Sequence, residues 1–150
     1  MVETMRTLLL STCLALASAE DLRSRRIPDG LITFGMVGSL CLSTRLIDTV
    51  LGAFVGYTVF WLTRTITRRA LGLGDVKLSM FVGSVIGPVD WWTAAMISAG
   101  TAGFVLLGAI ALRAADRKTP LPFAPFLAVG GLTVWLGRGL AAVPCSVIPR

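Results

Sequence analysis

The sequence consists of long apolar runs joined by short polar connections. We expect helices from these runs at residues 4–22, 27–44, 47–63, 70–88, 91–112 and 121–143. A helix that crosses a bilayer needs about 20 mostly apolar residues. The 150-residue chain is 55% hydrophobic and 15% charged, with a mean hydropathy of +0.80. The pattern predicts an all-α polytopic membrane protein with about six spans in a single domain, residues 1–150.

The basic residues predict the orientation, because cytoplasmic connections are enriched in Lys and Arg. With the N-terminus outside, the cytoplasmic side holds ten of the fourteen basic residues: Arg23, Arg25, Arg26, Arg64, Arg68, Arg69, Lys77, Arg113, Arg117 and Lys118. The opposite side then holds Arg6, Arg45, Arg138 and Arg150. We therefore expect the N-terminus outside. The net charge of +6 is spread over short groups rather than one basic face, so no nucleic-acid partner is expected.

The N-terminal run has a second interpretation. Arg6, the apolar residues 8–16 and the small residues 17–19 resemble a cleavable signal peptide. The basic cluster after the run, residues 23–26, outweighs Arg6. This favours a retained helix.

Several residues near the ends of the runs carry further expectations. Residues 88–90 break the fourth run from the fifth, and Trp91 and Trp92 then form an expected aromatic pair at the membrane interface. Arg138 lies late in the last run, so it either snorkels outward or ends that helix early.

The carboxylates at the cytoplasmic helix ends are the candidate catalytic residues. The chain has no histidine, so acid–base chemistry falls mainly to Glu20, Asp21, Asp29 and Asp75. Asp75 lies about 7 Å inside the fourth helix, where a charge costs up to about 3 kcal/mol. A residue in that position is a functional candidate.

The topology predicts that Asp21 and Asp75 lie at one membrane depth, because the first helix ends on the side where the fourth begins. Counting back from Asp21 and forward from Asp75 gives two stripes of small residues: Ser18, Ala17 and Cys13, and Ser79, Gly83 and Gly87. We expect these stripes to let the first and fourth helices approach closely. Gly72 and Gly74 add backbone freedom and room for a substrate strand before the acid.

Two small-residue spacings occur within the apolar runs. Gly52-x-x-x-Gly56 and Gly83-x-x-x-Gly87 are typical of helices that pack closely in lipid. Such pairs are common in membrane helices, so we expect a packing role rather than a functional one.

A pair of carboxylates that shares one proton can hydrolyse a peptide bond. The ionised member takes a proton from water while the protonated member donates to the carbonyl oxygen. In the alternative interpretation, Asp21 pairs with Arg25 at i+4 and a nearby Lys or Arg neutralises Asp75. Both acids would then be structural.

Three segments together resemble the type IV prepilin peptidase family, membrane aspartic peptidases with a GxGD motif. DLRSRRIPD at residues 21–29 is similar to the family's aspartate followed by an Ile-Pro or Leu-Pro pair. GLGDVKL at residues 72–78 matches the GxGD segment. PFAPFLAVG at residues 122–130 is similar to the proline- and phenylalanine-rich segment before the last helix.

The resemblance implies that Asp21 and Asp75 are the catalytic pair. It also implies that the supporting or substrate-binding motif residues are Gly72, Gly74, Lys77, Pro28, Asp29, Pro122 and Pro125. Glu20 is a weaker rival of Asp21, because adjacent helical residues point about 100° apart.

Three of these motif features have expected structural roles. Asp29 is expected to shape the start of the second helix and Lys77 to anchor at the interface. For residues 122–126, a helix start with packed aromatics and a contact with substrate both stay open.

The resemblance further implies prepilin or pseudopilin substrates, whose basic leader is cut at the cytoplasmic face of the inner membrane. No metal or other cofactor is expected, because two acids without histidine or additional converging ligands do not make a convincing metal site. Larger members carry an N-terminal region with cysteine pairs and also methylate the product. Cys13, Cys41 and Cys145 form no CxxC pair, so we expect cleavage without methylation. Presenilin-like proteases pair GxGD with Tyr-Asp, whereas Tyr57 is followed by Thr58 here.

Two other functions stay open. The same acids could relay protons in a small proton-coupled transporter or channel component. The chain could also be an inactive relative that assembles with pilin machinery.

Overall fold

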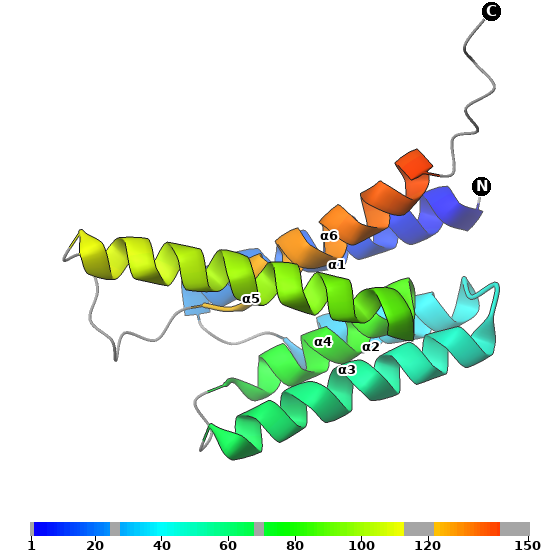
Figure 1. Ribbon diagram of the computed structural model, residues 1–150. Helices are drawn as coiled ribbons and strands as arrows, with labels where there is room; N and C mark the ends of the chain where they lie inside the picture. Colours follow the sequence, from blue (N-terminus) through cyan, green and yellow to red (C-terminus); the bar gives the residue numbers. More distant parts are fainter. Residues whose placement is uncertain (1, 25–27, 68–70, 113–121, 142–150) are drawn as a thin grey trace, which may run out of the picture.

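The computed structural model describes residues 2–24, 28–67, 71–112 and 122–141, and this part of the chain is a bundle of helices without strands (Figure 1). The helices are α1 (Val2–Ser24), α2 (Asp29–Cys41), α3 (Leu46–Ile66), α4 (Leu73–Ile86), α5 (Pro88–Ala111) and α6 (Ala124–Ala141). The predicted all-α class is confirmed, with ends that differ from the expected ones by a few residues.

Two of the helices, α3 and α5, have the length and composition of membrane spans, with mean hydropathies of 1.5 and 1.9. Large apolar side chains point outward from them, including Ile47, Phe54, Phe104 and Leu107. The helices α2 and α4 have only 13 and 14 residues. These features support a membrane protein, while six spans and an N-terminus outside stay predictions.

The helices α3 and α4 form one pair and α1 and α6 another, while α5 packs against α3 and α6 and α2 packs against α4 and α1 (Figure 1). The pair α3–α4 makes the most extensive contact, and α1 packs mainly against α6, which in turn packs against α5. Leu10 and Leu14 of α1 are fully buried in the shared core with Phe81 and Leu127. α1 thus supplies part of this core, and a retained first helix stays a prediction.

The helices α3 and α4 approach to backbone contact at Gly52 and Gly83. A Cβ atom at either glycine would overlap the carbonyl oxygen of the other, and one at Gly56 would overlap that of Ser79. The predicted packing role is confirmed for Gly52, Gly56 and Gly83, whereas a Cβ atom at Gly87 would have nothing within 4 Å. The expected close packing of the α4 stripe against α1 is wrong, because the glycines of α3 admit the α4 backbone, while α1 touches α4 only lightly.

A single residue, Gly87, joins α4 to α5. Its φ of +83° lies in the region that favours glycine. Pro88 begins α5, where its fixed φ suits the first helical position and its missing N–H leaves no donor unpaired. The helix break therefore falls at Gly87, just before the predicted one at residues 88–90.

The two tryptophans that follow this turn have different environments. Trp91 is fully buried, its Nε1 donates to the Ser79 Oγ at 3.1 Å, and its ring lies edge-on to Phe60. Trp92 is half exposed. The expected interfacial pair is wrong for Trp91, because consecutive residues on a helix point about 100° apart and only one can face outward.

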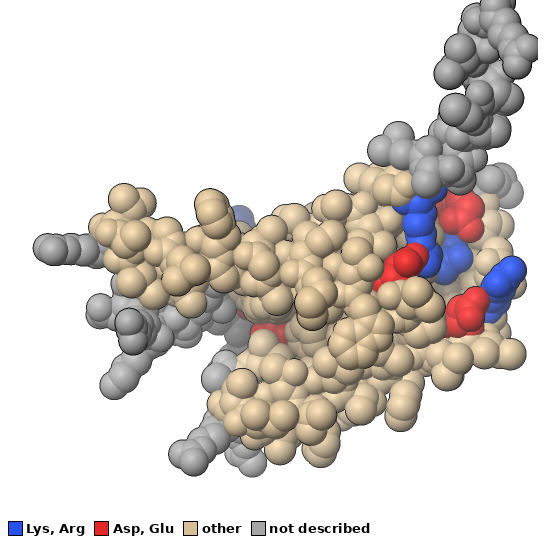
Figure 2. Space-filling model, in the orientation of Figure 1, with Lys and Arg blue, Asp and Glu red and all other residues tan. Residues whose placement is uncertain are grey.

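The end of the bundle that holds the start of α1 carries a cavity of about 840 Å³ that charged and apolar side chains line together. Figure 2 shows the hollow, where acidic and basic side chains gather. They pair among themselves: Arg6 with Glu3, Arg45 with Asp48, and Arg138 with Asp90. Since α6 continues past Arg138, that residue does not end the helix early, and Asp90 of α5 balances its charge.

The opposite end holds the remaining described basic residues. Arg23, Arg64 and Lys77 lie near the end of α1, the end of α3 and the start of α4. The other residues counted for the orientation lie outside the described part: Arg25, Arg26, Arg68, Arg69, Arg113, Arg117, Lys118 and Arg150.

Candidate active site

The start of α4 fixes Asp75. Gly72 is the N-cap residue, which makes Asp75 the third helical residue, and its carboxylate accepts a hydrogen bond from the Gly72 N–H. This is the backward half of a capping box, and the helix dipole also favours a carboxylate there. The side chain is nevertheless buried, with the residue only 9% exposed.

Gly72 gives this carboxylate its space. A Cβ atom at Gly72 would lie 3.0 Å from the Asp75 Oδ2. Its φ of −66° and ψ of 148° are open to any residue, so the expected need for backbone freedom is wrong at this position. Arg64 of α3 donates to the carbonyl oxygen of Leu71 and holds the preceding turn. Gly74 is half-buried in the first turn of α4.

The last turn of α1 presents Asp21, which is 8% exposed, whereas the adjacent Glu20 is half-buried. The Oδ2 of Asp21 accepts a hydrogen bond from the backbone N–H of Ala124 at 3.3 Å. Ala124 is the first residue of α6. Sequence analysis missed this contact. Pro125 does signal a helix start nearby, but nothing local identifies the carboxylate that meets it.

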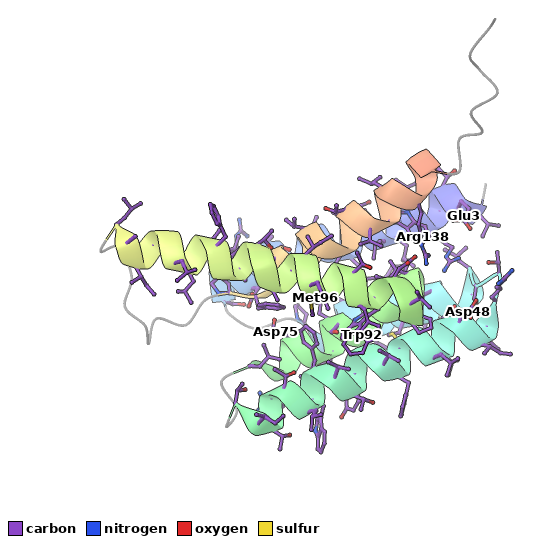
Figure 3. The ribbon with its side chains drawn as sticks, in the orientation of Figure 1. Glu3, Asp48, Asp75, Trp92, Met96 and Arg138 are labelled. Atoms are coloured by element: carbon purple, nitrogen blue, oxygen red, sulfur yellow. The ribbon has the colours of Figure 1, made fainter. Side chains whose placement is uncertain are left out.

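The fold brings Asp21 and Asp75 within electrostatic reach of each other. Figure 3 shows Asp75 toward one end of the bundle, away from Glu3, Asp48 and Arg138 at the other. Within the described part of the chain, no Lys or Arg forms an ion pair with either carboxylate. Two buried carboxylates this close can hold one proton between them.

The alternative in which both acids are structural ion pairs depends partly on Arg25, which lies outside the described residues. The same part of the chain contains no group of three or more Asp, Glu, Cys or His side chains able to hold a metal ion.

Lys77 links the GxGD segment to the start of α2. Its Nζ lies 2.6 Å from the Asp29 Oδ1, and Asp29 is the first residue of α2, directly after the N-cap Pro28. This ion pair joins the two motif segments, residues 21–29 and 72–78, in addition to the electrostatic interaction between Asp21 and Asp75. Lys77 acts on Asp29 here, and its expected role as an interfacial anchor stays a prediction.

We expect this ion pair to contribute little to stability. The two side chains are 42% and 74% exposed, and exposed pairs contribute about 0.2–1 kcal/mol. A double-mutant cycle of Lys77→Gln and Asp29→Asn, measured by unfolding in mixed micelles, should give a coupling energy below about 1 kcal/mol. A coupling above about 2 kcal/mol would contradict this expectation.

The segment before α6 packs its aromatic rings. Phe123 lies 5.7 Å from Phe60 of α3 and 6.5 Å from Phe126, measured between ring centroids. Pro122 and Pro125 are half-buried beside them. The predicted helix start with packed aromatics is confirmed, and a contact with substrate stays a prediction.

Comparison with known proteins shows the family to which this chain belongs. A family model described as "Type IV leader peptidase family" matches residues 8–112, a range that includes Asp21 and Asp75. The chain belongs to the type IV leader peptidase family. The third motif segment, residues 122–130, lies beyond the matched range.

The names of similar curated proteins agree with this family assignment. The chain is 36% identical over 140 residues to the prepilin leader peptidase/N-methyltransferase of Xanthomonas campestris pv. campestris, covering 85% of this chain. It is 33% identical over 141 residues to the type 4 prepilin-like proteins leader peptide-processing enzyme of Escherichia coli O78:H11, covering 86%. It spans about half the length of these curated relatives, 48% and 51%. No solved structure matches the chain.

Proposed function

We propose that this chain is a membrane aspartic endopeptidase that removes the basic leader peptide from type IV prepilins or pseudopilins. The observation that carries the proposal is the electrostatic interaction between Asp21 and Asp75, buried residues from distant segments, in a member of the type IV leader peptidase family. The names of the relatives support the substrate class. They do not favour the transporter alternative.

The proposed chemistry needs one ionised and one protonated carboxylate. The ionised member takes a proton from a water molecule, and the oxygen of that water attacks the carbonyl carbon of the scissile peptide. The protonated member donates its proton to the carbonyl oxygen. The C–N bond then breaks as a proton passes to the leaving nitrogen, which yields a free carboxyl group and a free amine.

The proposed site lies at the cytoplasmic end of the bundle. The predicted topology supports this placement, because it assigns ten of the fourteen basic residues of the sequence to the side of the two aspartates, and cytoplasmic connections are rich in Lys and Arg. A basic leader in the cytoplasm followed by an apolar helix in the bilayer would bring its junction to this depth.

Purified protein in lipid should cleave prepilin-like substrates of the same genome between the basic leader and the apolar segment. The product N-terminus, read by mass spectrometry, should follow directly after the leader and carry no methyl group even with a methyl donor present. A pilin without its leader is the control substrate. In vesicles, cleavage should require access of the leader to the cytoplasmic face. If no prepilin or pseudopilin is cleaved under any lipid condition, the proposed function is wrong.

A further inference from the structure

The backbone N–H groups in the first turn of α6 have few partners within the helix. The first amides of a helix lack partners within it. In α6, the amides of Phe126 and Leu127 both donate to the Phe123 carbonyl oxygen at 3.1 Å. Pro125 has no N–H. The Ala124 N–H is therefore the donor that this turn leaves for another group, and it goes to Asp21.

Asp21 needs such a donor more than Asp75 does. Asp75 lies at the N-terminal end of its own helix, where the dipole favours a negative charge. Asp21 lies in the last turn of α1, where the dipole of that helix disfavours one. The positive end of the α6 dipole opposes the unfavourable effect of the α1 dipole on the Asp21 carboxylate, and the Ala124 N–H donates a hydrogen bond to that carboxylate.

The contact also fixes the position of the carboxylate. The helices α1 and α6 pack along their lengths, whereas α1 touches α4 only lightly. Packing between α1 and α4 therefore does little to hold Asp21 beside Asp75, while the start of α6 holds it directly. Phe123, packed on Phe60 of α3, ties this turn to the helix pair that carries Asp75.

We propose that residues 122–126 are a positioning device for Asp21, in which the Ala124 N–H holds the Asp21 carboxylate in place for its work with Asp75. Pro125 keeps the donor single by removing the next amide of the turn. The proposal rests on the proposed function, since it assigns this segment a role in the same reaction. Ala124 acts through Asp21 and is therefore a positioning residue.

Ala124→Pro tests the donor, because proline is accepted at the first helical position and lacks the N–H, while its ring also adds atoms at a fully buried site. We expect kcat for leader cleavage to fall roughly 10-fold or more, as expected for losing a hydrogen bond to an ionised group, with KM unchanged. Leu46→Pro is the control for proline at a first helical position, because Leu46 is the exposed first residue of α3 after an extended N-cap, remote from the aspartates, and hydrogen exchange in Asp21→Ala tests the same contact without adding bulk at Ala124. Leu46→Pro should cleave like the parent protein.

The double variant Ala124→Pro/Pro125→Ala distinguishes a lost donor from a damaged helix. It returns one N–H to the first turn, one residue further on, and capping oxygens accept from such positions. Recovery of at least half of the lost kcat supports the proposal. Parent-like cleavage by Ala124→Pro would overturn it. So would a folded double variant that stays as slow as the single one.

Amide hydrogen exchange provides a readout that does not depend on activity. In the parent protein, the Ala124 amide should exchange slowly, and Asp21→Ala should accelerate it roughly 10-fold or more, with the amides of Phe126 and Leu127 unchanged. An unchanged exchange rate at Ala124 would overturn the positioning role even if cleavage occurs. Protection of Ala124 in a protein that cleaves no prepilin would leave the contact standing and remove the proposed function.

Discussion

Asp21→Asn and Asp75→Asn are each expected to reduce leader cleavage by at least about 10³-fold, to a level near background. Asparagine preserves the size of each side chain but can neither accept a proton from water nor donate an acidic one to the carbonyl oxygen. Because both carboxylates serve one step, the double variant should be no slower than either single variant. The measurement is kcat/KM with a fluorescent prepilin substrate in lipid.

The control for this prediction is Glu20→Gln, next to Asp21 on α1. Glu20 is half-buried and points about 100° away from Asp21, so the variant should retain cleavage within about threefold. Each variant should unfold at the same temperature as the parent protein. Folded Asn variants that cleave as well as the parent would exclude the paired-carboxylate mechanism. Additive losses in the double variant would instead assign the two acids to separate steps.

Gly83→Leu is expected to prevent folding of the helix pair α3–α4. Even a Cβ atom at Gly83 overlaps the Gly52 carbonyl oxygen, so the two backbones must separate to admit any side chain. We expect Gly83→Ala to lower the free energy of unfolding by roughly 3 kcal/mol and Gly83→Leu to leave little folded protein. Unfolding in mixed micelles, followed by circular dichroism, measures both.

The matched control is Gly100→Ala in α5, where a Cβ atom would have nothing within 4 Å. Replacing a helical glycine in open space should stabilise the protein by about 0.5–1 kcal/mol. The same chemical change thus has opposite signs at two helical glycines. If Gly83→Ala and Gly100→Ala had equal effects, close backbone contact would not be what holds α3 and α4 together.

Much of the architecture could be predicted because local patterns determine it. Apolar runs of helical length predicted six helices within a few residues of their ends, and glycine spacing predicted a close contact without identifying the partner. The partner depends on competition between surfaces. The glycines of α3 admit the α4 backbone, while α1 touches α4 only lightly, so the small-residue stripe of α4 faces α3.

The candidate site also has one part that local sequence determines and one part that depends on tertiary packing. The sequence by itself determined which carboxylates are candidates, because acids in apolar surroundings at helix ends are costly and Gly72 directly precedes the helix that carries Asp75. Only the tertiary structure decided what holds Asp21: the amide of Ala124, more than a hundred residues further along the chain. A hydrogen bond between a side chain and a distant backbone leaves no periodic signal, because every residue but proline carries an N–H. Packing alone decides which donor meets which acid.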